Sequence, residues 1–515
     1  MLNTPESSEE LSVPTATLNN QSASGYLTTI GLEVHAQLLT ESKMYCSCSA
    51  SIAYAPPNSH VCPVCMGMPG TLPVINSEAV HKTLLTGLAL SCTIPPLSKF
   101  DRKNYPYPDL MKGYQISQYD LPFCQDGFLD VEETDPRGNI KRTFRIGIIR
   151  AHLEEDTARL MHRTDPNGTP YSLMDVNRAG VPLMEVVSAP DIASPEEAEL
   201  YLMKMRHLLR WLNVSTGNME EGAFRCDANV SVRPVGQKEY GTKVEIKNMN
   251  SFKSVVAALK YEVLRQTAAL KSGERIPQET RGWDDVRNIT ISQRTKEQAH
   301  DYRYFPEPDL PPLTFTPEQV ETLRAELPEL PDARRNRFAT QYNLTPYDAL
   351  QLASSKATAD YFEQVVEGAS DEHARTAATF VVNELPRLLG DEGGSIEGSS
   401  LKPAILRELV DLVAGGTINH GIAKSLLPEL FKDGGSPKAI VSERGLAILR
   451  DESALEQAVD AAVAANPKAV ADYLGGKESA LGAFLGPIMR ATSGQADSNT
   501  VREMLKRKLE EMRDK

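Results

Sequence analysis

Long apolar runs are missing from this chain of 515 residues. No stretch approaches the ~18 consecutive apolar residues that a membrane-spanning helix needs. Residues 1–25 are rich in Ser, Thr, Asn and Glu and lack the apolar core of a signal peptide. We therefore expect a disordered N-terminal extension, no membrane partner and a cytoplasmic location.

Two glycine-rich nucleotide motifs are also missing. The sequence contains no G-x-x-x-x-G-K-[ST] segment and no convincing G-x-G-x-x-G segment, which argues against a P-loop and a Rossmann turn. An excess of positive charge is missing too, because the formal net charge is −14. This charge argues against a protein that coats nucleic acid non-specifically, but it allows a local basic surface that binds RNA.

Ordinary globular features account for most of what is present. Hydrophobic residues make up 41% of the chain and charged residues 24%, which is typical of a folded protein. At one domain per ~150 residues, the chain should fold into several domains. From Tyr26 to about residue 313, period-two apolar patterns alternate with Gly, Pro and Asn. This predicts a β-rich domain, with helices at residues 77–90 and 195–212.

Helices follow this β-rich domain. Four prolines in residues 305–312 should prevent regular structure, and Thr316 with Pro317 then provides a helix start. A segment rich in Gly and Ser at residues 390–400 separates two helical sets, and a last helix at 499–515 is rich in Lys and Arg. We therefore predict an α+β protein with a β-rich catalytic domain (26–313), a helical domain (314–400) and a helical tail domain (401–515).

The cysteines are unevenly spaced. A C-x-C pair and a C-x-x-C pair are separated by thirteen residues and comprise Cys46, Cys48, Cys62 and Cys65. Both pairs have the spacing of zinc chelates, and in a cytosolic protein such a cluster favours a metal site over disulfides. We expect a structural Zn²⁺ with all four coordination positions filled. Unbound thiols are the alternative.

Three segments of the sequence contain acidic residues that could bind a metal ion. Glu33 and His35 alternate with apolar residues, so both should lie on the polar face of a strand. Glu154 lies in a run of acids, and Glu185 interrupts an apolar run in which a lone carboxylate would be costly to bury. Together these four side chains could form an oxygen-rich site suited to Mg²⁺. A solvated strand face and a surface turn are the alternatives.

Two further segments place cations beside acids and amides. Arg225, Asp227 and Asn229 alternate with small apolar residues, and Lys243 and Lys247 follow the same rule in the next segment. Such strands could line a groove for the phosphates of ATP and their metal ions. An exposed antiparallel sheet with cross-strand ion pairs is the alternative.

Longer segments resemble the family of B subunits of the GatCAB amidotransferases. They are residues 30–35 (IGLEVH), 62–70 (CPVCMGMPG), 103–110 (KNYPYPDL), 113–118 (GYQISQ), 152–156 (HLEED), 175–178 (DVNR), 301–309 (DYRYFPEPD) and 486–487 (GP). The resemblance extends from about Thr28 to the C-terminus and leaves out the first twenty-odd residues.

The resemblance implies a fold and a reaction. The fold is a catalytic cradle of the glutamine-synthetase and guanidino-kinase type, then a helical domain and a tail domain that helps to bind tRNA. In the reaction, ATP phosphorylates the side-chain carboxylate of Glu-tRNA(Gln) or Asp-tRNA(Asn), and ammonia then displaces phosphate to give the amide. This is the activity of a carbon–nitrogen ligase with glutamine as the amide donor.

The resemblance also implies partners and site residues. The chain contains no Gly/Ser-rich amidase stretch, so a glutaminase A subunit with a small C subunit should supply ammonia within a heterotrimer. By position, Glu33, His35, Glu154 and Glu185 match the Mg²⁺ site of the family's kinase centre, and the four clustered cysteines match a zinc site that some members carry. The assignment of the five residues on the two basic segments to nucleotide contacts rests mainly on strand faces.

Two other functions fit parts of the sequence. A free-standing ATP-dependent amide ligase would act on a small acid without tRNA. A zinc-stabilised RNA-binding scaffold would bind tRNA without catalysis, and the acid clusters would then have no purpose. A related archaeal-type E subunit would carry an inserted synthetase-like domain, for which no segment has room.

Overall fold

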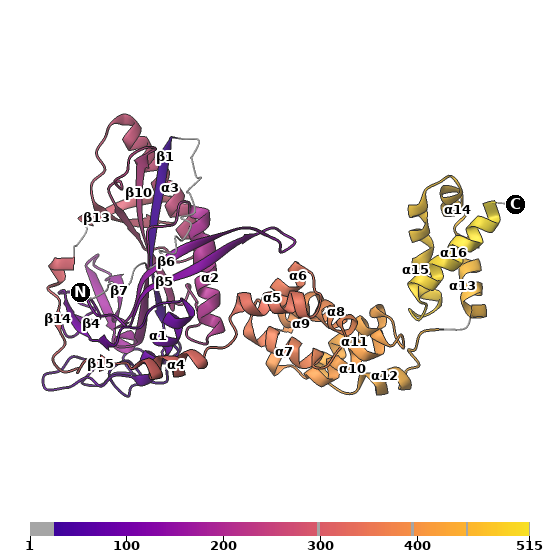
Figure 1. Cartoon of the computed structure of the whole chain (residues 1–515), viewed down its shortest axis with the longest axis horizontal. Coiled ribbons are helices and arrows are strands. Elements are labelled where there is room, and N and C mark those ends of the chain that lie inside the picture. The colour runs from indigo at the N-terminus through magenta and orange to yellow at the C-terminus, as the bar shows by residue number, and fades with distance from the viewer. Residues whose placement is uncertain (1–24, 296–298, 393–395, 450–451, 514–515) are drawn as a thin grey trace, which may run out of the picture. The chain divides into compact units, whose positions relative to one another are not determined.

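The computed structural model describes residues 25–295, 299–392, 396–449 and 452–513. The predicted disordered extension lies outside the described residues, apart from Gly25. Contacts divide the chain into two compact units, residues 1–133 with 140–328 and residues 134–139 with 329–515 (Figure 1). The domain boundaries predicted at residues 313 and 400 stay predictions.

The first unit is built on an eight-stranded sheet, and the α+β class is confirmed. In spatial order its strands are β13 (Ile289–Thr295), β12 (Glu279–Asp284), β11 (Val244–Lys247), β10 (Phe224–Pro234), β1 (Tyr26–Gln37), β9 (Pro182–Ser188), β6 (Ile140–Glu155) and β5 (Cys124–Thr134). β1 pairs antiparallel with both β10 and β9, and β6 pairs antiparallel with β9. β1 therefore lies at the centre and brings its polar face between two partners.

Alternation along β1 separates a core face from a polar face. Ile30, Leu32 and Val34 are fully buried, whereas the residues between them remain partly exposed. Three helices complete this unit's core: α1 (Ser77–Ala89) packs on β6, and α3 (Phe252–Ser272) packs on β10 and on α2 (Pro195–Trp211). The helices predicted at residues 77–90 and 195–212 are confirmed, and Asn76 and Ser194 cap their first turns.

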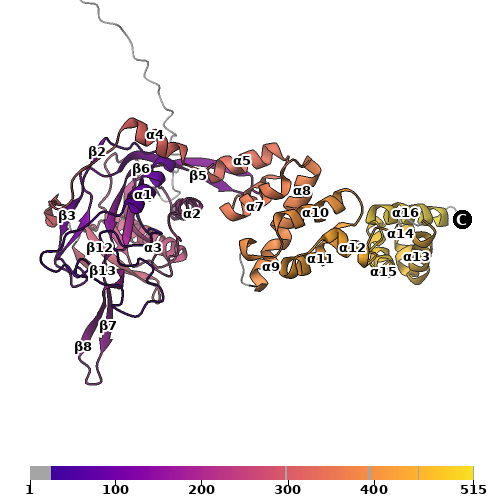
Figure 2. The same cartoon turned by 90° about the horizontal axis from the view of Figure 1, so that it is seen from below.

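Short strands surround the large sheet. β14 (Phe305–Pro306), β3 (Asp101–Asn104) and β4 (Tyr114–Ser117) form one small sheet; β15 (Leu313–Thr314) pairs with β2 (Leu97–Ser98); β7 (Arg159–Thr164) pairs with β8 (Pro170–Asp175). Figure 2 shows the β7–β8 hairpin projecting from the first unit. The expectation that prolines exclude regular structure from residues 305–312 is wrong at β14. Pro306 is tolerated there because β14 is an edge strand.

Helices make up the rest of the chain. The helix start predicted at Thr316 and Pro317 is confirmed: α4 (Pro317–Ala325) closes the first unit, and Thr316 forms a capping box with Gln319. The second unit contains α5 (Pro331–Gln341), α6 (Pro346–Leu352), α7 (Lys356–Val366), α8 (Asp371–Thr379), α9 (Leu385–Glu392), α10 (Pro403–Ala414), α11 (His420–Asp433), α12 (Pro437–Glu443), α13 (Glu452–Ala465), α14 (Pro467–Leu474), α15 (Gly482–Ala491) and α16 (Ser498–Arg513). Short 3-10 or π turns are η1 (Val176–Arg178), η2 (Ala299–Tyr302), η3 (Phe380–Glu384), η4 (Ile396–Gly398) and η5 (Glu478–Leu481). Within the described residues, no helix combines the length and apolar character that crossing a bilayer requires.

Candidate functional site

Polar side chains from four neighbouring strands line one face of the large sheet. In the register, His152 on β6 lies opposite Glu185 on β9. Glu185 in turn lies opposite His35 on β1, and His35 lies opposite Arg225 on β10. Because paired residues on neighbouring strands point to the same face, these four side chains form one row across the sheet.

A β-bulge in β6 decides which of its side chains reach this face. Ile148 and Arg150 pair with consecutive residues of β9, so two residues of β6 oppose one residue there. Before the bulge, even-numbered side chains such as Ile148 are buried in the core, and beyond it odd-numbered ones such as Leu153 are. The extra residue thus turns Arg150, His152 and Glu154 toward the polar face.

Three candidate metal ligands lie close together: His35, Glu154 and Glu185, which we call the acid cluster. His35 Nε2 lies 3.2 Å from Glu185 Oε2 and 3.7 Å from Glu154 Oε1, and one ligand atom from each residue lies within 4.8 Å of the others. Both carboxylates are buried, where two negative charges repel unless a cation compensates them. Oxygen-rich donors suit a hard divalent cation, so these residues fit Mg²⁺.

The charges of this cluster shift the acid–base properties of its members. Burial acts to lower the pKa of His35, but Glu185, Glu154 and Asp227 outweigh it and raise that pKa to about 9. Burial lowers the pKa of His152 to about 3 and raises the pKa of Glu154. Burial also acts to raise the pKa of Glu185, but neighbouring histidines hold it well below its usual range. The carboxylates of the cluster thus favour positive charge at the position of His35.

Cations on β10 and β11 are paired with acids. Arg225 Nη2 donates to Asp156 Oδ2 at 2.7 Å, and Lys247 Nζ donates to Asp227 Oδ2 at 2.7 Å. Although burial opposes it, Asp227 raises the pKa of Lys247 above its usual value. These ion pairs hold two cations in place beside the acid cluster, and their contact with the phosphates of ATP stays a prediction.

The remaining predicted site residues differ in how close they lie to the acid cluster. Asn229 Nδ2 donates to Glu33 Oε1 at 2.8 Å, and Glu33 lies two residues before His35 on the same face of β1. Glu33 thus lies beside the group of three ligand atoms and not within it. Lys243 precedes β11 and is exposed. In the part of the chain that the structure describes, no hydrogen bond or ion pair joins Lys243 to the cluster.

His152 was missing from the sequence-based ligand set. Its Nε2 lies 3.7 Å from Glu185 Oε2 and 4.0 Å from Glu154 Oε2. A signal was available, because His152 and Glu154 have the same two-residue spacing as Glu33 and His35. The adjacent run of acids looked like a turn and concealed this strand pattern.

Lys103 was missing as well, and aromatic rings surround it. Lys103 Nζ lies 5.1 Å from the ring centroid of Tyr302 and 5.6 Å from that of Tyr105. Although burial opposes it, Glu154 and nearby tyrosines hold the pKa of Lys103 well above its usual value. The pairing of β3 with β14 brings residues 103–110 and 301–309 near each other. Only the family resemblance pointed to these segments.

The four clustered cysteines have the geometry of a tetrahedral metal site. Cys65 Sγ lies 3.4 Å from Cys46 Sγ, 3.8 Å from Cys62 Sγ and 3.8 Å from Cys48 Sγ. Sulfurs of a tetrahedral site with Zn–S bonds of ~2.3 Å lie ~3.8 Å apart, whereas a disulfide requires ~2.05 Å. The spacing therefore fits Zn²⁺ and not a disulfide.

A buried lysine supports the cysteine cluster. Lys43 is 1% exposed, and its Nζ lies 3.5 Å from Cys65 Sγ and donates to His60 O at 2.8 Å. The hydrogen bond from Cys46 lowers the pKa of Cys65 to about 4, against burial and with help from the charge of Lys43. Metal ligation requires thiolates, which Lys43 favours at Cys65, whereas burial and neighbouring thiols raise the pKa of Cys46 and Cys48 when no cation is present.

Known proteins match nearly the whole chain. The family model described as the GatB/GatE catalytic domain matches residues 28–321, and the GatB domain matches residues 360–509. A protein of Thermomicrobium roseum, named as the B subunit of an aspartyl/glutamyl-tRNA(Asn/Gln) amidotransferase, is 54% identical over 484 residues, which cover 94% of this chain and 99% of the relative. A protein of Dehalococcoides mccartyi with the same name is 52% identical over 494 residues, with the same coverage.

Proposed function

Because the chain belongs to the GatB/GatE family, we propose that it is the ATP-using B subunit of a tRNA-dependent amidotransferase. Its substrates are ATP and the side-chain carboxylate of Glu-tRNA(Gln) or Asp-tRNA(Asn). The observation that carries the assignment of the site is the convergence of His35, Glu154 and Glu185 on one sheet face of the matched domain.

The reaction has two steps. The γ-phosphoryl group moves from ATP to a carboxylate oxygen and leaves ADP, so one P–O bond breaks and another forms. Ammonia then attacks the carbonyl carbon of the acyl phosphate, phosphate leaves, and a proton passes from nitrogen to phosphate. Activation is needed because a free carboxylate is a poor electrophile at neutral pH.

The acid cluster is assigned to magnesium and the basic strands to phosphates. His35, Glu154 and Glu185 would hold Mg²⁺, with Glu33 on the adjoining position of β1. Bound Mg²⁺ would offset negative charge on the phosphoryl group during transfer. Asp156 orients Arg225, and Asp227 orients Lys247. Asn229 belongs to the proposed nucleotide contacts by its position on β10 only, and Lys243, which precedes β11, by the sequence pattern only.

Zinc and the wider architecture complete the proposal. The four cysteines bind a structural Zn²⁺ whose coordination is closed, so it takes no part in catalysis. The large sheet is the catalytic cradle, and we propose that its fold is of the glutamine-synthetase and guanidino-kinase type. The helical tail helps to bind tRNA.

Ammonia comes from another chain. The sequence contains no amidase stretch, and the names of the relatives describe each of them as one subunit of a larger enzyme. We therefore assign a glutaminase A subunit and a small C subunit as partners. The purely structural scaffold is not favoured, because it leaves the converging acids of the catalytic-domain match without a role.

Substituting Glu154 tests this function. In a complex reconstituted with A and C subunits, Glu154→Gln should lower ATP-dependent amidation of misacylated tRNA by more than about 100-fold. The loss should be this large because changing a residue that only supports a metal ligand already costs about 10- to 100-fold. Glutamine hydrolysis by the partner should continue. Glu133→Gln, which alters an acid on β5 outside the cluster, is the matched control and should amidate normally.

Three outcomes would contradict the proposal. Full amidation by Glu154→Gln would remove this carboxylate from the catalytic set. Amidation of a free carboxylic acid without tRNA would favour a free-standing ligase. Binding of tRNA by a wild-type complex that consumes no ATP would favour the scaffold.

A further inference from the structure

Most cations close to the acid cluster already have an acidic partner. Arg225 pairs with Asp156, Lys247 with Asp227, and Lys112 with Glu155. These ion pairs fix the positions of the cations, but they also neutralise part of their charge. A group that carries additional negative charge into this face needs a cation that is not already paired.

Arg150 is such a cation. It lies on β6 just beyond the β-bulge, on the face that also carries His152 and Glu154. Its side chain is half-buried, and its Nε is buried without a hydrogen-bond partner. Among the described residues, no carboxylate lies within 4.0 Å of its guanidinium. Leaving a buried donor without a partner is costly, so this side chain is prepared for a ligand that accepts hydrogen bonds.

The strand register places Arg150 at the edge of the cluster. Arg150 lies opposite Val187 of β9, two residues before His152, which lies opposite Glu185. Glu154 follows two residues further along β6. Because residues two apart on a strand share a face, the guanidinium of Arg150 is presented beside the acid cluster.

We propose that Arg150 binds oxygens of the phosphoryl group that ATP transfers to the tRNA-borne carboxylate. This inference rests on the proposed function. A guanidinium presents two parallel N–H donors that match two phosphoryl oxygens, and it stays protonated throughout the transfer. The same oxygens belong first to the γ-phosphate of ATP and then to the acyl phosphate, so one contact serves both states. The bulge is the structural device that puts Arg150 on this face.

Nucleotide binding to the reconstituted heterotrimer tests the inference. The probes are Mg²⁺ complexes of ADP and of β,γ-imido-ATP, measured by calorimetry with wild type, Arg150→Gln and Arg150→Lys. Arg150→Gln should bind β,γ-imido-ATP about 10- to 100-fold more weakly, since charge-assisted bonds are the stronger kind. Its affinity for ADP, which lacks the γ-phosphoryl group, should stay within about 2-fold. Arg150→Lys should bind β,γ-imido-ATP more tightly than Arg150→Gln but should support little amidation, because an ammonium lacks the two parallel N–H donors of a guanidinium.

A control on the same strand separates this role from a structural one. Arg145 also lies on β6 but is exposed and paired with Asp130, so Arg145→Gln should change neither affinity. If Arg150→Gln does not fold, Arg150→Lys carries the test, and it should still lose affinity for β,γ-imido-ATP and not for ADP.

Two results would overturn the assignment of Arg150. One is unchanged affinity of the variants for β,γ-imido-ATP. The other is an equal loss for ADP, which would place Arg150 on the inner phosphates. A wild-type complex that amidates normally would leave the proposed function intact in either case. Failure of wild type to amidate misacylated tRNA would reject the proposed function itself.

Discussion

Asp156 holds several polar side chains in place around the candidate site. Its carboxylate accepts hydrogen bonds from Gln37 Nε2 and Arg225 Nη2, both at 2.7 Å, and Arg178 Nε lies 3.6 Å from its Oδ1. Burial acts to raise the pKa of Asp156, but the two arginines hold it below its usual value. The sequence showed Asp156 only as the last member of an acid run. A buried anchor and a surface acid look alike until their partners from other strands are known.

Asp156→Asn should destabilise the first unit. The amide removes the negative charge that compensates Arg225, and we expect a loss of about 2 kcal/mol in the free energy of unfolding. The cost stays below that of a fully buried pair because the Arg225 side chain is 37% exposed. The measurement is urea unfolding followed by tryptophan fluorescence. Asp130→Asn breaks an exposed pair with Arg145 and should change stability by less than about 1 kcal/mol; equal losses for the two variants would contradict the prediction.

The alternation of polar and apolar residues predicted which face of a regular strand is polar, but it did not predict where a strand is interrupted by a bulge. Alternation identified the polar faces of β1, β10 and β11 because their side chains follow a strict period of two. The same rule fails in β6, where the bulge after Ile148 exchanges the two faces. A bulge inserts one residue without a distinctive composition, so the sequence of β6 contains no clear sign of it.

The cysteine segment should depend on its metal. We expect metal analysis to find about one Zn²⁺ per chain, and Cys65→Ser to retain much less, because a closed structural site needs all four ligands. Chelation at elevated temperature should expose residues 43–74 to protease and lower the melting temperature, since binding free energy contributes to folding. Cys226→Ser alters a buried cysteine on β10, outside the cluster. It should keep its zinc, and equal zinc loss in both variants would argue against the assignment.

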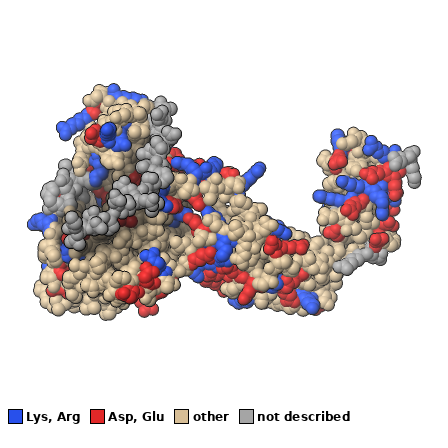
Figure 3. All heavy atoms as spheres, in the orientation of Figure 1, with Lys and Arg blue, Asp and Glu red and all other residues tan. Residues whose placement is uncertain are grey.

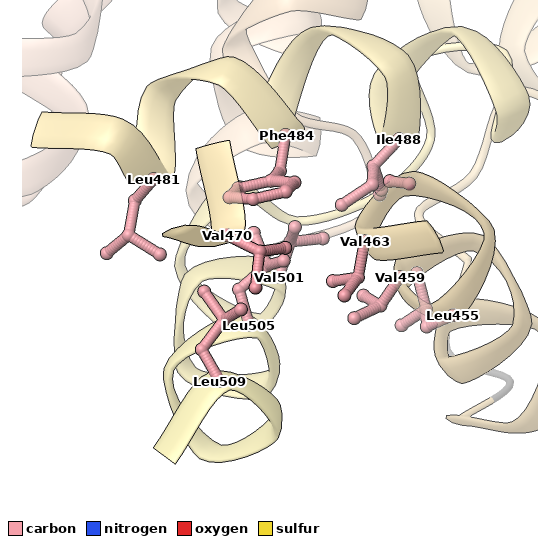
Figure 4. Packing of buried hydrophobic residues seen from close by; sticks show 12 residues of the cluster. Leu455, Val459, Val463, Val470, Leu481, Phe484, Ile488, Val501, Leu505 and Leu509 are labelled. Carbon is pink, nitrogen blue, oxygen red and sulfur yellow. The ribbon is translucent and has the colours of Figure 1, made fainter. Parts of the chain in front are cut away.

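The C-terminal end of the chain has its own core. Val501, Leu505 and Leu509 of α16 are fully buried against residues of α13, α14 and α15 (Figure 4). Deleting residues 499–515 would therefore remove part of this core together with the basic side chains. On the face shown in Figure 3, Lys and Arg side chains lie among Asp and Glu side chains.

Charge reversal on α16 is the sharper test of tRNA binding by the tail. Arg502 and Lys506 are exposed, so Arg502→Glu with Lys506→Glu should leave the core intact and weaken tRNA binding, most strongly at low salt. If each residue contacts one phosphate, the slope of log affinity against log salt should fall by about 2. Lys432→Glu with Lys438→Glu makes the same change in charge on α11 and α12 and should have little effect. Unchanged tRNA affinity of the α16 variant would place recognition elsewhere.

The α+β class, the polar faces of the central strands and the clustering of the four cysteines could all be predicted from the sequence. They follow from periodicity and local spacing, which are written along the chain. Folding was needed to establish that His35, Glu154 and Glu185 meet, that His152, Lys103 and Arg150 lie with or near them, and that Lys243 does not. Those outcomes depend on strand register and on a single bulge, and pairing between distant segments sets both.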